Sequence, residues 1–99
     1  MNSSDRILAQ RYAKAYDALA TSNPQAQARA EELAAASQAL AGAQAFMTDP
    51  NVSVPAKTGF LREALASAPA AQAFLNTLVQ SKRYSLLGQI VREVNALLD

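Results

Sequence analysis

Two adjacent carboxylates, Glu31 and Glu32, are the residues of this chain whose types best suit general acid and base chemistry. Such a pair works when both carboxyl groups face one substrate. Neighbouring residues on a helix, however, point about 100° apart, so these two side chains face different directions. With Arg29 close by, the pair is typical of a solvated helix face, and we interpret it in that way.

The other residue types on which enzymes and cofactor sites depend are missing or scattered. The chain has no Cys and no His, which excludes disulfides, thiol chemistry, the usual zinc sites and the commonest general base. Its serines therefore lack a histidine to activate them. The three glycines, Gly42, Gly59 and Gly88, are too far apart for a phosphate-binding loop. We predict that the chain is not an enzyme and has no catalytic, metal-binding or cofactor-binding residues.

The composition indicates one small helical domain. A length of 99 residues suits a single domain, and 23 alanines favour helices around a modest core. The net charge of +1 exerts no strong attraction on nucleic acid. No apolar run approaches the ~20 residues of a membrane span, and the first five residues lack the blocks of a signal peptide. We therefore expect no nucleic-acid partner and no insertion into a membrane.

Capping residues, prolines and glycines predict the helices of the first half. The first helix is expected to run to about Ala20, after a cap at Ser3, Ser4 or Asp5. Asn23 and Pro24 are typical of a cap followed by the first helical residue. The second helix is then expected over 24–41, with Gly42 ending it in the left-handed conformation.

The second half is divided in the same way. A short helix over 43–47 is stopped by Asp49 and Pro50, because the residue before a proline is disfavoured in a helix. Ser53 caps the next helix, and a fifth helix spans about 69–82. A last helix begins at Tyr84 or Ser85 and carries a core-facing stripe of Leu87, Ile90, Val91, Val94, Leu97 and Leu98. These elements predict an all-α protein, a single compact six-helix bundle.

The first helix carries two apolar stripes, whereas one is enough to attach a helix to its own domain. One stripe consists of Leu8, Tyr12, Ala15 and Leu19, and the other, about 100° further round, of Ala9, Ala13, Tyr16 and Ala20. The spare stripe either adds to the core or faces another protein.

The fifth helix raises the same question. Its large apolar face consists of Ala71, Phe74, Leu75 and Leu78, and a stripe of small residues beside it consists of Ala70, Ala73, Thr77 and Ser81. If this small stripe faces the Tyr12–Ala15 stripe, the two line a shallow groove in which an amphipathic helix from another chain can lie. The alternative is that both stripes are covered from within the bundle.

Three stretches, taken together, resemble the N-terminal domain of the ATP synthase delta subunit, whose mitochondrial counterpart is the oligomycin-sensitivity-conferring protein. They are RYAKA at 11–15, DPNVS at 49–53 with Lys57, and FLNTLVQSKR at 74–83. The resemblance covers nearly the whole chain, and it implies a six-helix N-terminal domain over 1–99. Lys82 departs from the family pattern, which has glycine there, so the turn after the fifth helix is expected to differ.

The resemblance also implies a function. It indicates a non-catalytic stator component, part of the peripheral stalk of a proton-translocating F-type ATP synthase. Such a subunit binds the N-terminal helix of an alpha subunit and holds the catalytic head against rotation. By position, Tyr12, Ala15 and Thr77 are implied to line the contact, and the stripes add Leu8, Leu19, Ala73 and Ser81.

Other expectations concern the rest of the complex. The family's C-terminal domain, which meets the stalk b subunits, is absent from this sequence, so we expect contact with b only through that missing domain. The resemblance places the chain peripherally, at the cytoplasmic face of a bacterial inner membrane. Two other functions stay open: a generic helical adaptor that binds another amphipathic helix, and a small nucleic-acid-binding helical domain, against which the charge balance argues.

Overall fold

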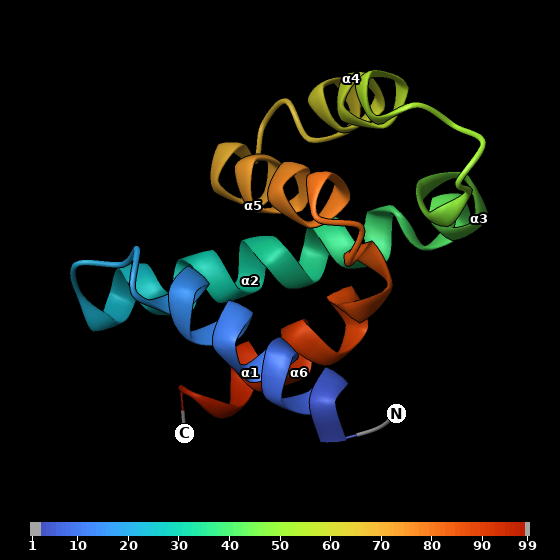
Figure 1. Cartoon of the computed structure of the whole chain (residues 1–99). Helices are drawn as coiled ribbons and strands as arrows, with labels where there is room; N and C mark the ends of the chain where they lie inside the picture. Colours follow the sequence, from blue (N-terminus) through green and yellow to red (C-terminus); the bar gives the residue numbers. More distant parts are fainter. Residues whose placement is uncertain (1–2, 99) are drawn as a thin grey trace.

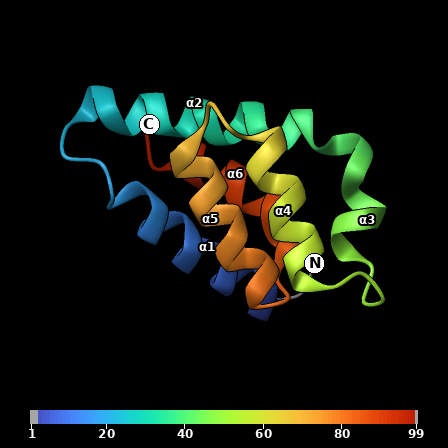
Figure 2. The same ribbon diagram turned by 90° about the horizontal axis from the view of Figure 1, so that it is seen from above.

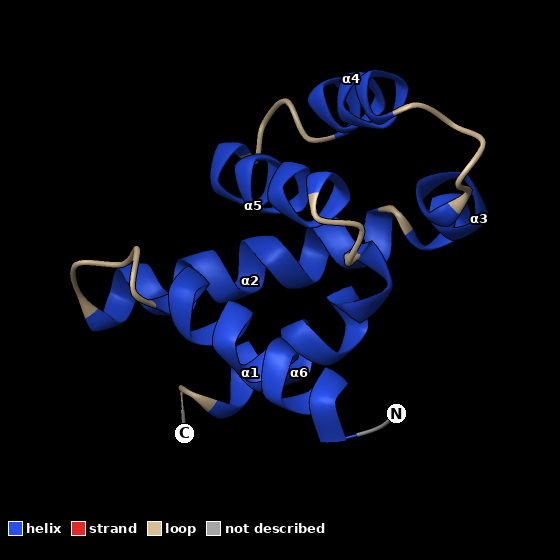
Figure 3. Cartoon of the chain, in the orientation of Figure 1, coloured by secondary structure: helices blue, strands red, loops and turns tan. Residues whose placement is uncertain are grey.

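The computed structural model describes residues 3–98, and helices form most of that part of the chain (Figures 1 and 3). The six α-helices are α1 (Ser3–Asp17), α2 (Asn23–Ala39), α3 (Gln44–Thr48), α4 (Val54–Ala64), α5 (Pro69–Gln80) and α6 (Leu87–Ala96). Two 3₁₀ helices, η1 (Ala41–Ala43) and η2 (Tyr84–Leu86), lead into α3 and α6. The described residues contain no strand, so the all-α prediction is confirmed.

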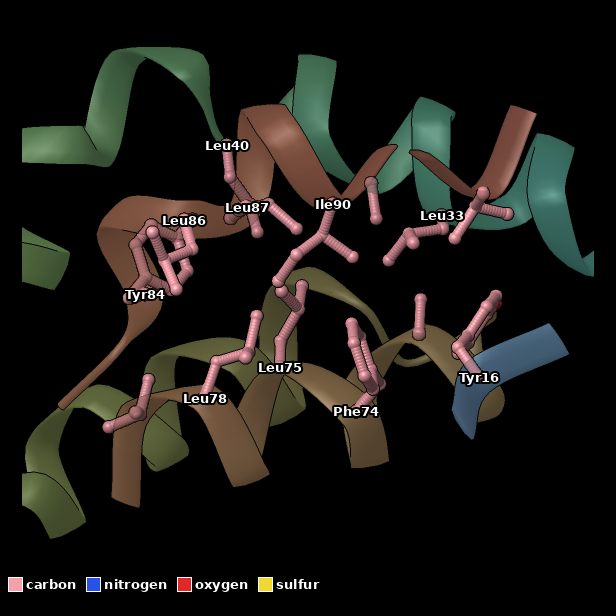
Figure 4. Packing of buried hydrophobic residues seen from close by; sticks show 14 of the residues in the cluster. Tyr16, Leu33, Leu40, Phe74, Leu75, Leu78, Tyr84, Leu86, Leu87 and Ile90 are labelled. Atoms are coloured by element: carbon pink, nitrogen blue, oxygen red, sulfur yellow. The ribbon is translucent and has the colours of Figure 1, made fainter. Parts of the chain in front are cut away.

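Helix α2 packs against α5 and α6 and runs along one edge of the bundle in the view of Figure 2. α1 and α6 pack against each other, and α4 and α5 run next to each other (Figures 1 and 2). One core joins the pairs, and Figure 4 shows Leu75 of α5 pointing toward Ile90 of α6 within it. No helix in residues 3–98 has the length and apolar character needed to cross a membrane.

The ends of α1 and the start of α2 differ from the prediction. All three expected caps of the first helix lie within α1, which ends at Asp17 rather than Ala20. The chain tightens there, because the Ala20 N–H donates to the Asp17 carbonyl (3.1 Å), three residues back. The cap of α2 is Ser22, not Asn23, since the Ser22 hydroxyl accepts the Gln25 N–H (3.3 Å).

Gly42 does not end the second helix in a left-handed conformation, as was expected. α2 ends at Ala39, and no glycine among residues 3–98 has a positive φ. The chain instead continues in a right-handed 3₁₀ turn, in which the Ala43 N–H donates to the Leu40 carbonyl (2.9 Å). A turn of the same hand leads directly into α3, so no left-handed residue is needed.

The end of α3 and the cap of α4 agree with the prediction. α3 ends at Thr48, and Asp49, before Pro50, has an extended backbone (φ −73°, ψ 118°). The Ser53 hydroxyl accepts the Ala56 N–H (3.2 Å), so Ser53 caps α4 as expected.

Helix α5 ends at Gln80, two residues earlier than predicted, in a turn that requires a left-handed residue. The Arg83 N–H donates to the Leu78 carbonyl (2.8 Å) and the Lys82 N–H to the Val79 carbonyl (3.1 Å). These two bonds define a Schellman motif, whose left-handed position favours glycine. Lys82 occupies it with φ 61°, and it is the one non-glycine residue with positive φ among residues 3–98.

The last helix buries less of its stripe than expected. Leu87, Ile90 and Val94 are buried, but Leu97 and Leu98 are 41% and 40% exposed. Both leucines come after the last residue of α6, Ala96, although Leu97 keeps helical backbone angles (φ −71°, ψ −16°). The prediction that they belong to the core is wrong.

Candidate helix-binding groove

The two apolar stripes of α1 differ in burial. Ala9, Ala13 and Tyr16 are buried, with no more than 1% of each residue exposed. α1 packs chiefly against α6, and the methyl groups of the two alanines allow this close approach. Three of the four residues of the second stripe therefore belong to the core, while Ala20, which follows α1, is half-buried.

The first stripe of α1 stays largely uncovered. Ala15 and Leu19 are exposed, with Leu19 at 55%, while Leu8 and Tyr12 are half-buried beside the core. A leucine so exposed keeps apolar surface in water that burial against a partner would remove.

The faces of helix α5 also differ in burial. Its large residues Ala71, Phe74, Leu75 and Leu78 are buried, together with Val79. In the small stripe, Ala73 and Thr77 are exposed, and Ala70 and Ser81 are half-buried. Each stripe singled out from the sequence thus has two exposed residues and two half-buried ones, so each is only partly covered by the bundle's own side chains.

Phe74 connects the two stripes. Its ring centroid lies 6.1 Å from that of Tyr12, in an edge-to-face arrangement, and 4.9 Å from that of Tyr16. Such aromatic pairs stabilise beyond simple burial. Phe74 is itself buried, so it forms the floor between the exposed residues of α1 and α5. We call this surface the α1–α5 groove: its walls are Leu8, Tyr12, Ala15 and Leu19 on one side and Ala70, Ala73, Thr77 and Ser81 on the other.

A chain of hydrogen bonds closes one end of the groove. Arg83 Nη1 donates to the Tyr12 hydroxyl (3.3 Å), which donates to Ser81 Oγ (3.2 Å). Ser81 Oγ in turn donates to the Thr77 carbonyl (2.9 Å). The bond with Ser81 lowers the pKa of Tyr12, against the opposing effect of partial burial, and Arg83 lowers it further.

At the other end, the groove opens into a shallow hollow of about 450 Å³. Its lining residues are Leu19, Arg29, Pro69, Ala70, Ala73, Phe74 and Thr77. Because Tyr12 meets the end of α5 and Leu19 meets its beginning, the two helices run antiparallel along the groove. Leu8, one turn before Tyr12, therefore lies beyond the end of α5.

The structure brings together most of the residues predicted to bind a partner. Tyr12 and Ser81 share a hydrogen bond, and Leu19, Ala73 and Thr77 line one hollow. Leu8 and Ala15 lie on the same stripe of α1. Binding of a partner by any of these seven residues stays a prediction.

Sequence reasoning missed three residues of the groove. Phe74 was assigned to the core alone, although it also forms the floor. Arg29 comes from α2, and no sequence pattern indicates that the turn after α1 brings it beside Leu19. Arg83, part of the stretch at 74–83 but not predicted to line the contact, reaches across to Tyr12.

Comparison with known proteins agrees with the resemblance. Residues 8–99 match the protein-family model described as the ATP synthase delta (OSCP) subunit. No curated protein and no solved structure matches the chain.

Proposed function

Because the chain belongs to the ATP synthase delta (OSCP) subunit family, we propose that its α1–α5 groove holds the N-terminal helix of an ATP synthase alpha subunit. Membership makes the chain a structural subunit of the ATP synthase peripheral stalk, and not an enzyme. The identity of the partner helix and its place of binding are our proposal.

The observation that carries this proposal is the pair of partly exposed stripes on either side of Phe74. The α5 wall has no side chain larger than threonine, so the backbone of a docked helix can approach closely. The floor is aromatic, and Leu19 at the open end supplies further apolar area. An amphipathic helix laid in a groove is a common mode of recognition, with anchors three or four residues apart.

The dimensions suit a short helix. The α5 wall runs from Ala70 to Ser81, the residue after α5, and this separation of eleven residues corresponds to about 17 Å at 1.5 Å per residue, or three helical turns. A partner helix of that length presents three or four apolar anchors to the groove. If each partner buries ~600–800 Å², the interface is of standard size.

This mode of binding suits a stator. During rotary catalysis the central shaft exerts torque on the catalytic head, and the peripheral stalk must keep the head from turning. A helix seated in a groove resists displacement through shape complementarity and apolar burial, without covalent attachment or bound cofactor.

Titration with a peptide of the alpha-subunit N-terminus tests the proposal. Ala73 is exposed in the middle of the α5 wall, so Ala73→Asp forces a carboxylate against the apolar face of the peptide. We expect the affinity to fall at least about tenfold, and Ala15→Asp on the opposite wall to weaken binding in the same direction. Ala35→Asp, at an exposed mid-helix position of α2 that does not line the hollow, is the matched control.

Circular dichroism checks that each variant keeps its helical content. A folded Ala73→Asp variant that binds the peptide as tightly as the unaltered chain contradicts the proposal. A scrambled peptide of the same composition, bound equally well, instead favours a generic adaptor for amphipathic helices.

We also propose where the subunit works. ATP synthase is a membrane-associated complex, and we place this chain peripherally at the cytoplasmic face of a bacterial inner membrane. Residues 1–99 act as the N-terminal domain that meets the alpha subunit, while contact with the b subunits belongs to the family's C-terminal domain. Cross-linking in isolated membranes is expected to join these residues to alpha and not to b.

A further inference from the structure

A second cavity lies away from the groove, where the loop before α4 meets the end of α5. Figure 2 shows the start of α4 beside the end of α5, with α3 close by. The cavity has a volume of about 270 Å³ and is more enclosed than the hollow of the groove. It is lined by Met47, Thr48, Pro50, Val52, Val54, Lys57, Val79, Lys82, Tyr84 and Ser85. None of these residues lines the groove.

The charge of Lys57, which lines this cavity, has no partner within the described part of the fold. It is 9% exposed, the one buried charged residue among those described. Within residues 3–98, its side chain makes no hydrogen bond and no ion pair. Its stem is buried, but its ammonium reaches the surface, so a partner from outside can pair with it. Its position favours an anionic partner, because the first turn of α4 carries the positive end of the helix dipole.

Lys82 adds a second positive charge to the same cavity. The left-handed backbone that it adopts is one where a side chain is disfavoured and glycine is the usual choice. Two lysines that each oppose a local preference therefore line one cavity. No acidic residue lines it to neutralise them.

The rest of the lining is mainly apolar. The apolar part consists of Met47, Pro50, Val52, Val54 and Val79, and Tyr84 and Ser85 complete the lining. The volume lies just below the ~300–1,000 Å³ of typical small-molecule sites, so the occupant is smaller than a drug-sized compound. An inorganic anion would pair with the lysines but leave this apolar part against water.

We propose that this cavity binds a carboxylate attached to a short apolar body, with the carboxylate paired to the Lys57 ammonium. The apolar body lies against the valines and Met47, and Lys82 attracts the anion at the rim. The carboxylate has two possible sources: a free short-chain acid, or an acidic side chain flanked by apolar residues in a polypeptide. This proposal does not depend on occupation of the α1–α5 groove.

Titration of the ¹⁵N-labelled chain, followed by amide chemical shifts, tests the proposal with matched probes. Hexanoate is expected to shift the amides of residues 47–58 and 79–86. Hexanol, with the same apolar body and no charge, and phosphate, with charge and no apolar body, are expected to bind at least tenfold more weakly. A short capped peptide in which one Glu is flanked by valines represents the polypeptide source.

Lys57→Met keeps the length of the apolar stem and removes the charge. We expect it to weaken binding of hexanoate or the peptide at least tenfold, whereas Lys14→Met, at an exposed lysine of α1, leaves binding unchanged. If Lys57→Met does not fold, Lys82→Gly serves in its place, because it removes the rim charge and suits the turn. It is then expected to weaken binding several-fold.

The outcomes separate clearly. Binding of hexanoate that depends on Lys57 supports a free acid, and binding of the peptide alone, with the same dependence, supports the polypeptide source. The proposal is overturned if neither carboxylate binds, if hexanol or phosphate binds as tightly, or if the lysine variants retain full affinity.

Discussion

The Glu32 carboxylate of α2 caps α5, because its Oε2 accepts the Ala71 N–H at 2.8 Å across 39 residues of sequence. Ala68, the residue before α5, has no side chain that can do this. A free N–H at a helix start needs an acceptor, and a carboxylate there also interacts favourably with the helix dipole. The interpretation of Glu31 and Glu32 as one solvated face is therefore wrong for Glu32, while Glu31 is exposed.

Replacing Glu32 with Gln is expected to destabilise the protein by about 1 kcal/mol, since the charge at the start of α5 is lost and the cap is weakened. Urea unfolding followed by circular dichroism measures this change. Glu31→Gln, one residue away and exposed, is the control and is expected to change the stability by less than about 0.5 kcal/mol. Equal effects of the two variants would show that the carboxylate does not cap α5.

Replacing Lys82 with Gly is expected to stabilise the protein by about 0.5–1 kcal/mol. A residue with a Cβ is destabilised by about 1–2 kcal/mol in the left-handed region, and glycine avoids this cost. Part of the resulting gain in stability is offset, because glycine also has more conformational freedom in the unfolded chain. Lys82→Ala removes the charge and keeps the Cβ, so it isolates the backbone effect and should leave stability nearly unchanged. Thermal unfolding that gives Gly and Ala the same midpoint would contradict this explanation.

Replacing Phe74 with Leu is expected to cost about 1–2 kcal/mol, because both ring contacts with Tyr12 and Tyr16 are lost together with buried area. The floor of the groove also changes, so affinity for the alpha-subunit peptide should fall. Phe60→Leu is the comparison, since Phe60 also contacts an aromatic ring but is 37% exposed. We expect a smaller loss of stability there and no change in peptide affinity.

Stability is expected to depend on pH through Tyr16. Burial, and then the charge of Glu32, raise the pKa of Tyr16 from 10.0 to about 12. The folded state therefore holds this proton where the unfolded state releases it. The resulting stability is fully present below pH 10 and is lost between pH 10 and 12, up to about 3 kcal/mol.

Tyr16→Phe removes that titration. Denaturant unfolding at several pH values should give a shallower fall in stability above pH 10 for the variant than for the unaltered chain. Some fall remains, because burial also raises the pKa of Tyr84. The variant also loses the bond from the Tyr16 hydroxyl to the Arg29 carbonyl (2.7 Å), which lowers stability at every pH without changing the slope. If stability falls equally steeply above pH 10 in the variant and in the unaltered chain, Tyr16 is not the source of the pH dependence.

Much of the fold was predictable because helix signals are local. Ser53 capping α4, the stop at Asp49 and Pro50, and the stripes of α1 and α5 depend on residues within a few turns of one another. The errors lie at helix ends, where the chain can take either a right-handed or a left-handed backbone conformation. At Gly42 the chain continues in a right-handed turn, and at Lys82 it takes the left-handed position without a glycine.

The residue pattern alone established an all-α chain with two apolar stripes on its first helix, and it did so because side-chain direction in a helix follows directly from spacing. It could not establish which stripe was core. That depended on α6 packing against α1 and on Phe74 reaching both Tyr12 and Tyr16. The cap of α5 by Glu32, 39 residues away, was likewise not predictable. These contacts join residues far apart in the chain, and only the packing of whole helices brings such residues together.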